Sequence, residues 1–167
     1  MKRRTLLAAP LVASVAALAM VGCTGEGKML QVSAPPPAQP TAKVERVVVW
    51  LPPETGLVSD RLGDAFVSAF AKYNVPVRYG RASALELNRG EDQARLMNEL
   101  RATHRVEVEV SSFRQAGGTP AEWTLAVAVY TGTGRTRLMT VQYRPGGAYD
   151  YSVANAVVQQ LHERGYL

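Results

Sequence analysis

The sequence predicts an α+β domain, an α/β sandwich built on a single mixed sheet, behind an export signal and a proline-rich tether. Two observations carry this prediction. Apolar residues recur with a period of two in some segments and with a helical period in others, and the segments follow the order β-α-β-α-β-β-β-α. Strands and helices in such an order pack as helices covering a sheet. All the periodic segments fall within residues 44–167, a length that suits one domain.

The first half of this domain alternates between strand and helix. Its predicted elements are a strand over 44–51, a helix over 59–73, a strand over 75–79 and a helix over 92–103. The first strand is β-branched and apolar on both faces, which is typical of a central buried strand, and Pro52 ends it. Ser59 stands at the N-cap position of the first helix, whose apolar side chains form one stripe.

The second half is predicted to contain three consecutive strands and a closing helix. These are strands over 105–113, 123–130 and 135–143, and a helix over 151–164. Valines alternate with Glu107 and Glu109 along the first of them, so these glutamates are expected on the outward face. Gly132 and Gly134 indicate a hairpin turn before the third strand. Gly165 stands where a helix C-cap glycine belongs.

The amino terminus has the pattern of a secretory signal. Lys2, Arg3 and Arg4 precede an uncharged apolar run over 6–21, and the small residue Gly22 stands directly before Cys23. The run is shorter than the roughly 20 residues that span a bilayer and is interrupted by a proline, which disfavours the alternative of a permanent transmembrane anchor.

Residues 20–23, Met-Val-Gly-Cys, resemble the bacterial lipobox. The resemblance implies cleavage between Gly22 and Cys23, after a diacylglycerol has been attached to the Cys23 thiol. Thr24, in place of the aspartate that retains lipoproteins in the inner membrane, implies an outer-membrane lipoprotein whose domain faces the periplasm. Two or three acyl chains would hold such a protein stably.

Charge and cysteine content exclude several classes of function. The precursor has 19 Lys and Arg against 14 Asp and Glu, and loss of residues 1–22 leaves 16 against 14. This balance gives no dense basic face, so nucleic acid is not an expected partner. Cys23 is the only cysteine, which excludes an internal disulfide and a thiolate metal site.

Residues 24–43 are expected to be a flexible tether between the lipid and the domain. Pro35, Pro36, Pro37 and Pro40 lie among small and polar residues that can bury little surface. A polyproline conformation rises about 3.1 Å per residue, so some 20 residues would hold the domain up to about 60 Å from the membrane.

The domain resembles a group of small periplasmic α/β domains. The strand 47–51 runs into Pro52, the helix 59–73 and the strand 75–77 follow, and Thr133-Gly134 falls in the last hairpin. In these features the chain is similar to the curli-secretion lipoprotein, the flagellar-operon lipoprotein and the amino-terminal domain of the Tol–Pal translocation protein TolB. That resemblance implies a protein that docks to envelope machinery, oligomerises or activates a partner.

The candidate metal-binding and catalytic side chains have simpler structural explanations. His104 and His162 are far apart and lack metal-ligand spacing, so they are expected at the surface or at strand ends, and no metal or other cofactor is predicted. Glu107 and Glu109 are expected to face solvent or a partner's arginine. The chain is therefore predicted to be non-enzymatic. The alternative is a periplasmic enzyme that uses Glu107, Glu109 or His104 in an unrecognised cleft.

The expected function is a membrane-tethered binding or assembly module for a cell-envelope complex, through a protein partner or self-association. Exposed aromatics at the sheet edges and in the loop 144–151, namely Tyr143, Tyr149 and Tyr151, are the candidate contacts. The plainer explanation of that loop is an ordinary connection. A lipopolysaccharide-assembly lipoprotein is a close variant of the module, but the helix expected over 92–103 disfavours it.

Overall fold

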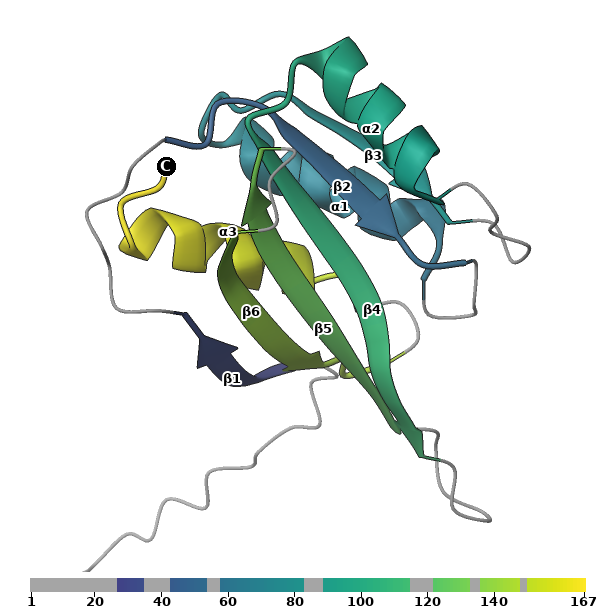
Figure 1. The fold of residues 1–167 in the computed structure, drawn as a ribbon. Helices are drawn as coiled ribbons and strands as arrows, with labels where there is room; N and C mark the ends of the chain where they lie inside the picture. Colours follow the sequence, from purple (N-terminus) through teal and green to yellow (C-terminus); the bar gives the residue numbers. More distant parts are fainter. Residues whose placement is uncertain are drawn as a thin grey trace, which may run out of the picture.

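A computed structural model describes residues 27–34, 43–53, 58–82, 89–114, 122–132, 136–147 and 150–167. Within these ranges the chain forms one mixed sheet of six strands and three helices, which confirms the predicted α+β class (Figure 1). The elements are β1 (Lys28–Ser33), β2 (Val47–Leu51), α1 (Asp60–Ala71), β3 (Val77–Arg81), α2 (Arg89–Leu100), β4 (His104–Arg114), β5 (Glu122–Thr131), β6 (Arg137–Arg144) and α3 (Val153–Glu163).

The strands lie in the order β1-β6-β5-β4-β2-β3. β2 pairs in parallel with both β3 and β4, while β4, β5, β6 and β1 pair antiparallel. The parallel half is built by two crossover helices, and the antiparallel half is a meander with a sixth strand added. β1 and β3 are therefore the two edges of the sheet.

Two helices cover one face of the sheet and the third covers the other. The core on the α1 and α3 side takes alternate residues of β2, such as Val47 and Val49, together with Phe66 of α1 and Leu161 of α3. The remaining β2 side chains point to the opposite face, where α2 lies (Figure 1). Both faces of β2 are thus buried, as its continuous apolar sequence predicts.

The helix ends follow from backbone conformation. Gly165, two residues after the end of α3, has φ +76°, which confirms its predicted role in ending the helix. α2 starts and stops about three residues earlier than predicted. Arg101 adopts a left-handed φ of 51°, and the Ala102 N–H returns to the Met97 carbonyl at 2.8 Å, so the helix closes at Leu100.

The amino-terminal segment differs from its prediction. Residues 24–43 were expected to form a tether throughout, but Lys28–Ser33 forms β1 and pairs antiparallel with β6. Val32 and Ala34 pack against the hydrophobic core. A tether over the whole of 24–43 is therefore wrong, and the domain includes residues before 44. The segment that contains Met29, Gln31 and Val32 is too short and too polar to be predicted as a strand.

No helix in the described ranges is long and apolar enough to cross a bilayer. The signal segment, the Gly22–Cys23 cleavage position and most of the proline-rich stretch lie outside the described residues.

Candidate functional site

The loop 144–151, expected to carry exposed tyrosines, is organised around a buried one. Tyr143 is only 3% exposed, so its expected role as a surface aromatic is wrong. Its hydroxyl donates to Asp150 Oδ2 at 3.2 Å and also meets the Ser152 hydroxyl. Asp150 further accepts the Gly146 N–H at 2.8 Å and the Ser152 N–H at 3.0 Å. The carboxylate therefore ties the loop to the start of α3.

These bonds change the acidity of Asp150. Burial alone would raise the pKa of its carboxyl, but hydrogen bonds from Gly146, Ser152 and Tyr143 outweigh burial and lower that pKa below its usual value. Gly27 completes the cluster, since a Cβ built there would lie 2.1 Å from the Tyr143 hydroxyl. The start of β1 therefore packs directly against Tyr143 and Asp150.

The other two predicted tyrosines divide differently. Tyr151 is half-buried, and its hydroxyl lies 3.1 Å from the Ser59 hydroxyl at the start of α1. Tyr149 lies outside the described residues. Tyr143 and Tyr151, the candidate tyrosines that the structure describes, both connect elements of the fold.

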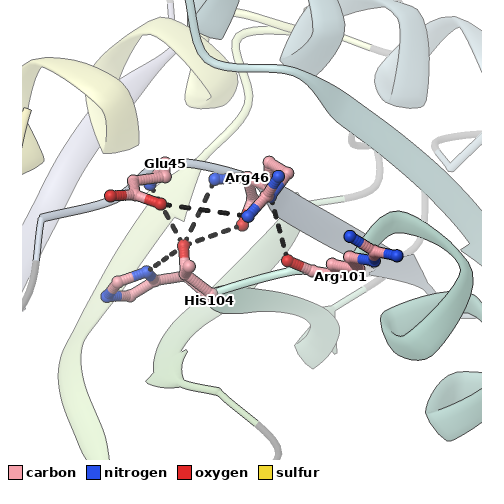
Figure 2. Close-up of polar contacts among 5 residues, drawn as sticks. Glu45, Arg46, Arg101 and His104 are labelled. Atoms are coloured by element: carbon pink, nitrogen blue, oxygen red, sulfur yellow. Dashed lines mark hydrogen bonds and ion pairs between the residues drawn. The ribbon is translucent and has the colours of Figure 1, made fainter.

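His104 begins β4, which agrees with the expected strand-end position, but its side chain is only 1% exposed and does not lie at the surface. Its Nδ1 lies 3.0 Å from Thr103 Oγ1, which also accepts the N–H groups of Glu45 at 3.1 Å and Arg46 at 3.2 Å (Figure 2). Arg46 in turn donates through Nε to the Arg101 carbonyl at 3.0 Å. The network locks the starts of β2 and β4 together.

Burial favours the neutral form of the His104 imidazole. Burial lowers the pKa of His104 below its ordinary value, and the nearby Glu45 carboxylate opposes this only in part. Its Nε2 is buried without a hydrogen-bond partner among the described residues. His162, by contrast, is exposed on α3 with its ring centroid 4.9 Å from that of Tyr73.

Glu107 does not face solvent as expected, because Gln93 of α2 and the neighbouring Arg105 contact its carboxylate. Its carboxylate lies 2.8 Å from Arg105 Nε and accepts Gln93 Nε2 at 3.0 Å. Arg105 also stacks over Tyr130, 4.7 Å from the ring centroid. Glu109 is exposed, in agreement with its prediction.

The histidine and the glutamates point away from each other. Alternate residues of a strand face opposite sides of a sheet, and His104 shares its face with the core residues Val106 and Val108. Glu107 and Glu109 project from the other face. His104 and Glu107 therefore cannot meet in one cleft. The described ranges contain no group of three or more His, Cys, Asp or Glu side chains placed to hold a metal ion.

A groove of about 630 Å³ lies between the edge strand β3 and α2. It is lined by residues of the edge strand, by one residue of β2 and by one side of α2: Trp50, Tyr79, Gly80, Arg81, Asp92, Arg95, Leu96 and Glu99. Sequence reasoning missed it, because the strand and the helix that form it are ordinary elements whose juxtaposition depends on the crossover.

The packing of Trp50 beside the groove depends on the absence of a side chain at Gly80. A Cβ built there would lie 2.6 Å and 2.9 Å from Cζ3 and Cε3 of Trp50, and 3.1 Å from Leu96 Cδ2. The indole therefore packs against bare backbone beneath the helix. Its Nε1 is buried with no partner among the described residues. A buried N–H without a partner is costly.

Ion pairs balance the charges beside the groove. On α2, Arg95 lies 2.8 Å from Asp92 and 4.0 Å from Glu99. Glu99 also lies 3.5 Å from Arg78 of β3. Exposed pairs such as these contribute little stability individually, but they leave a rim that carries both signs of charge.

Arg81 makes polar contacts at one end of the groove. Its guanidinium donates to the Val58 carbonyl at 3.0 Å and to Asp60 Oδ1 at 2.6 Å. Arg81 ends β3 and Asp60 begins α1, so the pair fixes the carboxyl end of the parallel strands. In open α/β sheets, ligands bind at this end, where consecutive helices pass to opposite faces.

The hydrogen bonds that bracket β3 show which of its backbone groups serve β2. The Val47 N–H donates to the Pro76 carbonyl at 3.0 Å, and the Ala82 N–H donates to the Leu51 carbonyl at 2.9 Å. Because strand residues alternate in direction, the even-numbered residues of β3 bond to β2. The N–H and C=O groups of the odd-numbered residues Val77, Tyr79 and Arg81 point to the outer edge.

No protein-family model and no curated protein sequence matches this chain. Among solved structures, it is similar to a PelC dodecamer variant from Paraburkholderia phytofirmans, at 12% identity and a TM-score of 0.49, over 84% of this chain and 99% of the other. A second PelC dodecamer from the same organism gives 10% identity and a TM-score of 0.48, over 83% and 96% of the two chains. Likeness at this level supports no inference about assembly or function.

Proposed function

We propose that the chain is a lipoprotein of the outer membrane, anchored through Cys23, whose periplasmic domain is a non-catalytic binding module for a cell-envelope protein. The sequence of residues 20–23 supports the anchor. The groove between the edge strand β3 and α2 supports the binding role, and it is the single observation that carries this role.

The groove suits an extended polypeptide segment. A peptide can add a strand to an exposed sheet edge, with main-chain hydrogen bonds giving affinity and side-chain pockets giving specificity. The outward backbone groups of Val77, Tyr79 and Arg81 offer the bonds, and the groove beside them has room for side chains of the segment. Rim charges of both signs favour a segment of mixed charge over a polyanion.

The same contacts argue against a catalytic role. Arg95 and Glu99, which line the groove, pair with neighbouring charges rather than converging on one point. The groups suggested for an alternative enzyme are also separated, with His104 in the core and Glu107 bound to Arg105 and Gln93. Neither set brings a nucleophile and a base together, as covalent or acid–base catalysis needs.

The test is site-specific photo-crosslinking in cells. A photoreactive amino acid replaces the exposed Arg95 beside the groove, and a control replaces the exposed Ser68 on α1. We expect a discrete product from position 95 and none from position 68. A product at twice the monomer mass would identify a second copy as the occupant. Equal labelling from both positions, or none from position 95, would contradict the groove as the binding site.

A pair of variants separates strand addition from simple side-chain contact. Tyr79→Pro and Tyr79→Ala both remove the phenol, but only the proline removes the outward N–H. Proline is tolerated on an edge strand when that N–H does not serve the sheet. We expect Tyr79→Pro to lower the crosslink yield at least about five-fold relative to Tyr79→Ala, as loss of one backbone hydrogen bond implies. Equal yields would show that no strand is added.

A further inference from the structure

The position of β1 determines how close the domain lies to its anchor. Gly27 is the first residue that the structure describes, and it packs against Tyr143 and Asp150. Cys23 precedes it by four residues. A chain spans at most about 3.3–3.6 Å per residue, so Cys23 lies within about 14 Å of this point on the domain. The proline-rich stretch contributes nothing to that distance, because it joins β1 to β2.

The outer side of β1 exposes apolar side chains. Met29 and Leu30 are each 45% exposed, and with Val67 they are the large hydrophobic residues exposed in the described ranges. The ladder to β6 shifts register between Met29 and Gln31, which leaves Leu30 as an extra residue. A bulge interrupts the alternation of a strand and redirects its side chains. Two consecutive apolar side chains are therefore presented to solvent.

Two cations lie at the end of the ladder that faces the anchor. Lys28 and Arg144 are register partners of β1 and β6, and both are exposed. Basic residues close to a bilayer attract anionic headgroups, while exposed apolar residues at its surface enter the interface. The four side chains form what we term the β1 patch: Lys28, Met29, Leu30 and Arg144.

We infer that the β1 patch rests on the surface of the bilayer that holds the lipid on Cys23, with anionic phospholipid as its partner. The inference rests on the proposed lipid anchor. The β1 patch has the composition that an interface favours, and the short chain between Cys23 and Gly27 keeps it there. The domain is thus oriented with its β1 edge at the membrane, and the β3 groove at the opposite edge faces away.

Fluorescence of an environment-sensitive label tests the contact. The full-length lipoprotein, with Leu30→Cys labelled by a nitrobenzoxadiazole dye, is reconstituted in vesicles of phosphatidylethanolamine and phosphatidylglycerol. The matched control carries Val67→Cys on α1, a helix that contacts β2 and β3. We expect a blue-shifted emission at position 30, quenched by lipids brominated in their acyl chains, and an aqueous emission at position 67. Omitting phosphatidylglycerol should reduce quenching at position 30 at least two-fold.

Mass spectrometry of the same preparation distinguishes the two proposals. If the lipid mass is present on Cys23 and both labels report water, the membrane contact of the β1 patch is wrong while the anchor stands. If the lipid mass is absent, the proposed anchor fails, and the contact fails with it. Should the labelled Leu30→Cys protein not fold, a label at Met29→Cys is expected to give the same shift, and an aqueous emission there overturns the inference.

Discussion

The two edge strands of the sheet, β1 and β3, differ in how their exposed backbone groups are surrounded. An edge strand exposes unpaired backbone groups, which invite pairing with other chains. At one edge, β1 is antiparallel, bulged and fixed at its start by the Asp150 cluster, and it exposes Met29 and Leu30. At the other, β3 is parallel, is flanked by α2 and borders a groove with paired charges. The two proposals therefore give each edge a partner of its own: lipid at β1 and polypeptide at β3.

The largest expected effect concerns the β1 edge. Asp150→Ala should lower the free energy of unfolding by about 3 kcal/mol, since hydrogen bonds to a charged group contribute about 1.5–3 kcal/mol each and several are lost together. Asp64→Ala is the matched control near β3, where one exposed carboxylate accepts one bond from Tyr79 at 3.1 Å. It should cost less than about 1 kcal/mol. Urea denaturation measures both, and equal losses would contradict the contrast between the edges.

A smaller effect is expected at the β3 edge. Gly80→Ala should cost about 1–3 kcal/mol, because the new methyl group overlaps the Trp50 ring. Gly90→Ala in α2 is the control: its Cβ meets no atom within 4 Å, and the change should raise stability by up to about 1 kcal/mol. Thermal unfolding gives both values, and tryptophan emission should shift only in Gly80→Ala. A neutral Gly80→Ala would show that the groove is looser than described.

The smallest expected effect is a loss of stability at low pH, and it comes from the buried His104 rather than from either edge of the sheet. His104 has a pKa lowered by burial, so the unfolded chain binds its proton more readily than the folded one. Stability should therefore fall as the pH drops below the unfolded value of about 6.5, by no more than about 1.4 kcal/mol per pH unit. His104→Gln should remove this slope, whereas His162→Gln, at an exposed position, should keep it. An unchanged slope in His104→Gln would refute the assignment.

The class and order of the elements could be predicted from the sequence, because local periodicity determines them. Strand 47–51 is apolar on both faces, and α1 carries a clear stripe. β1 escaped prediction because its residues Lys28–Ser33 are polar and depend on β6 for pairing. Its stability comes from a partner more than a hundred residues away, which local pattern does not report.

The sites were harder to predict than the fold, for a related reason. Tyr143 looked like a surface aromatic beside a glycine-rich loop, but alternation along β6 directs it inward with Val141. Glu107 looked solvent-exposed until the crossover brought Gln93 of α2 above it. Exposure on a sheet face depends on which helix covers that face, and a single sequence does not encode this locally. The groove beside β3 arises from the same long-range packing.

The pairing of β1 with β6 also limits the distance between the domain and its proposed anchor. While the strand is paired, four residues separate Cys23, the proposed lipid-carrying residue, from the domain, a reach of about 14 Å. If β1 left the sheet, the whole segment 24–43 would become free chain, with a reach of about 60 Å. Opening of one edge strand costs less than global unfolding. If the protein carries the proposed lipid on Cys23, the pairing of this six-residue strand determines whether the domain lies close to its membrane or can reach about 60 Å from it.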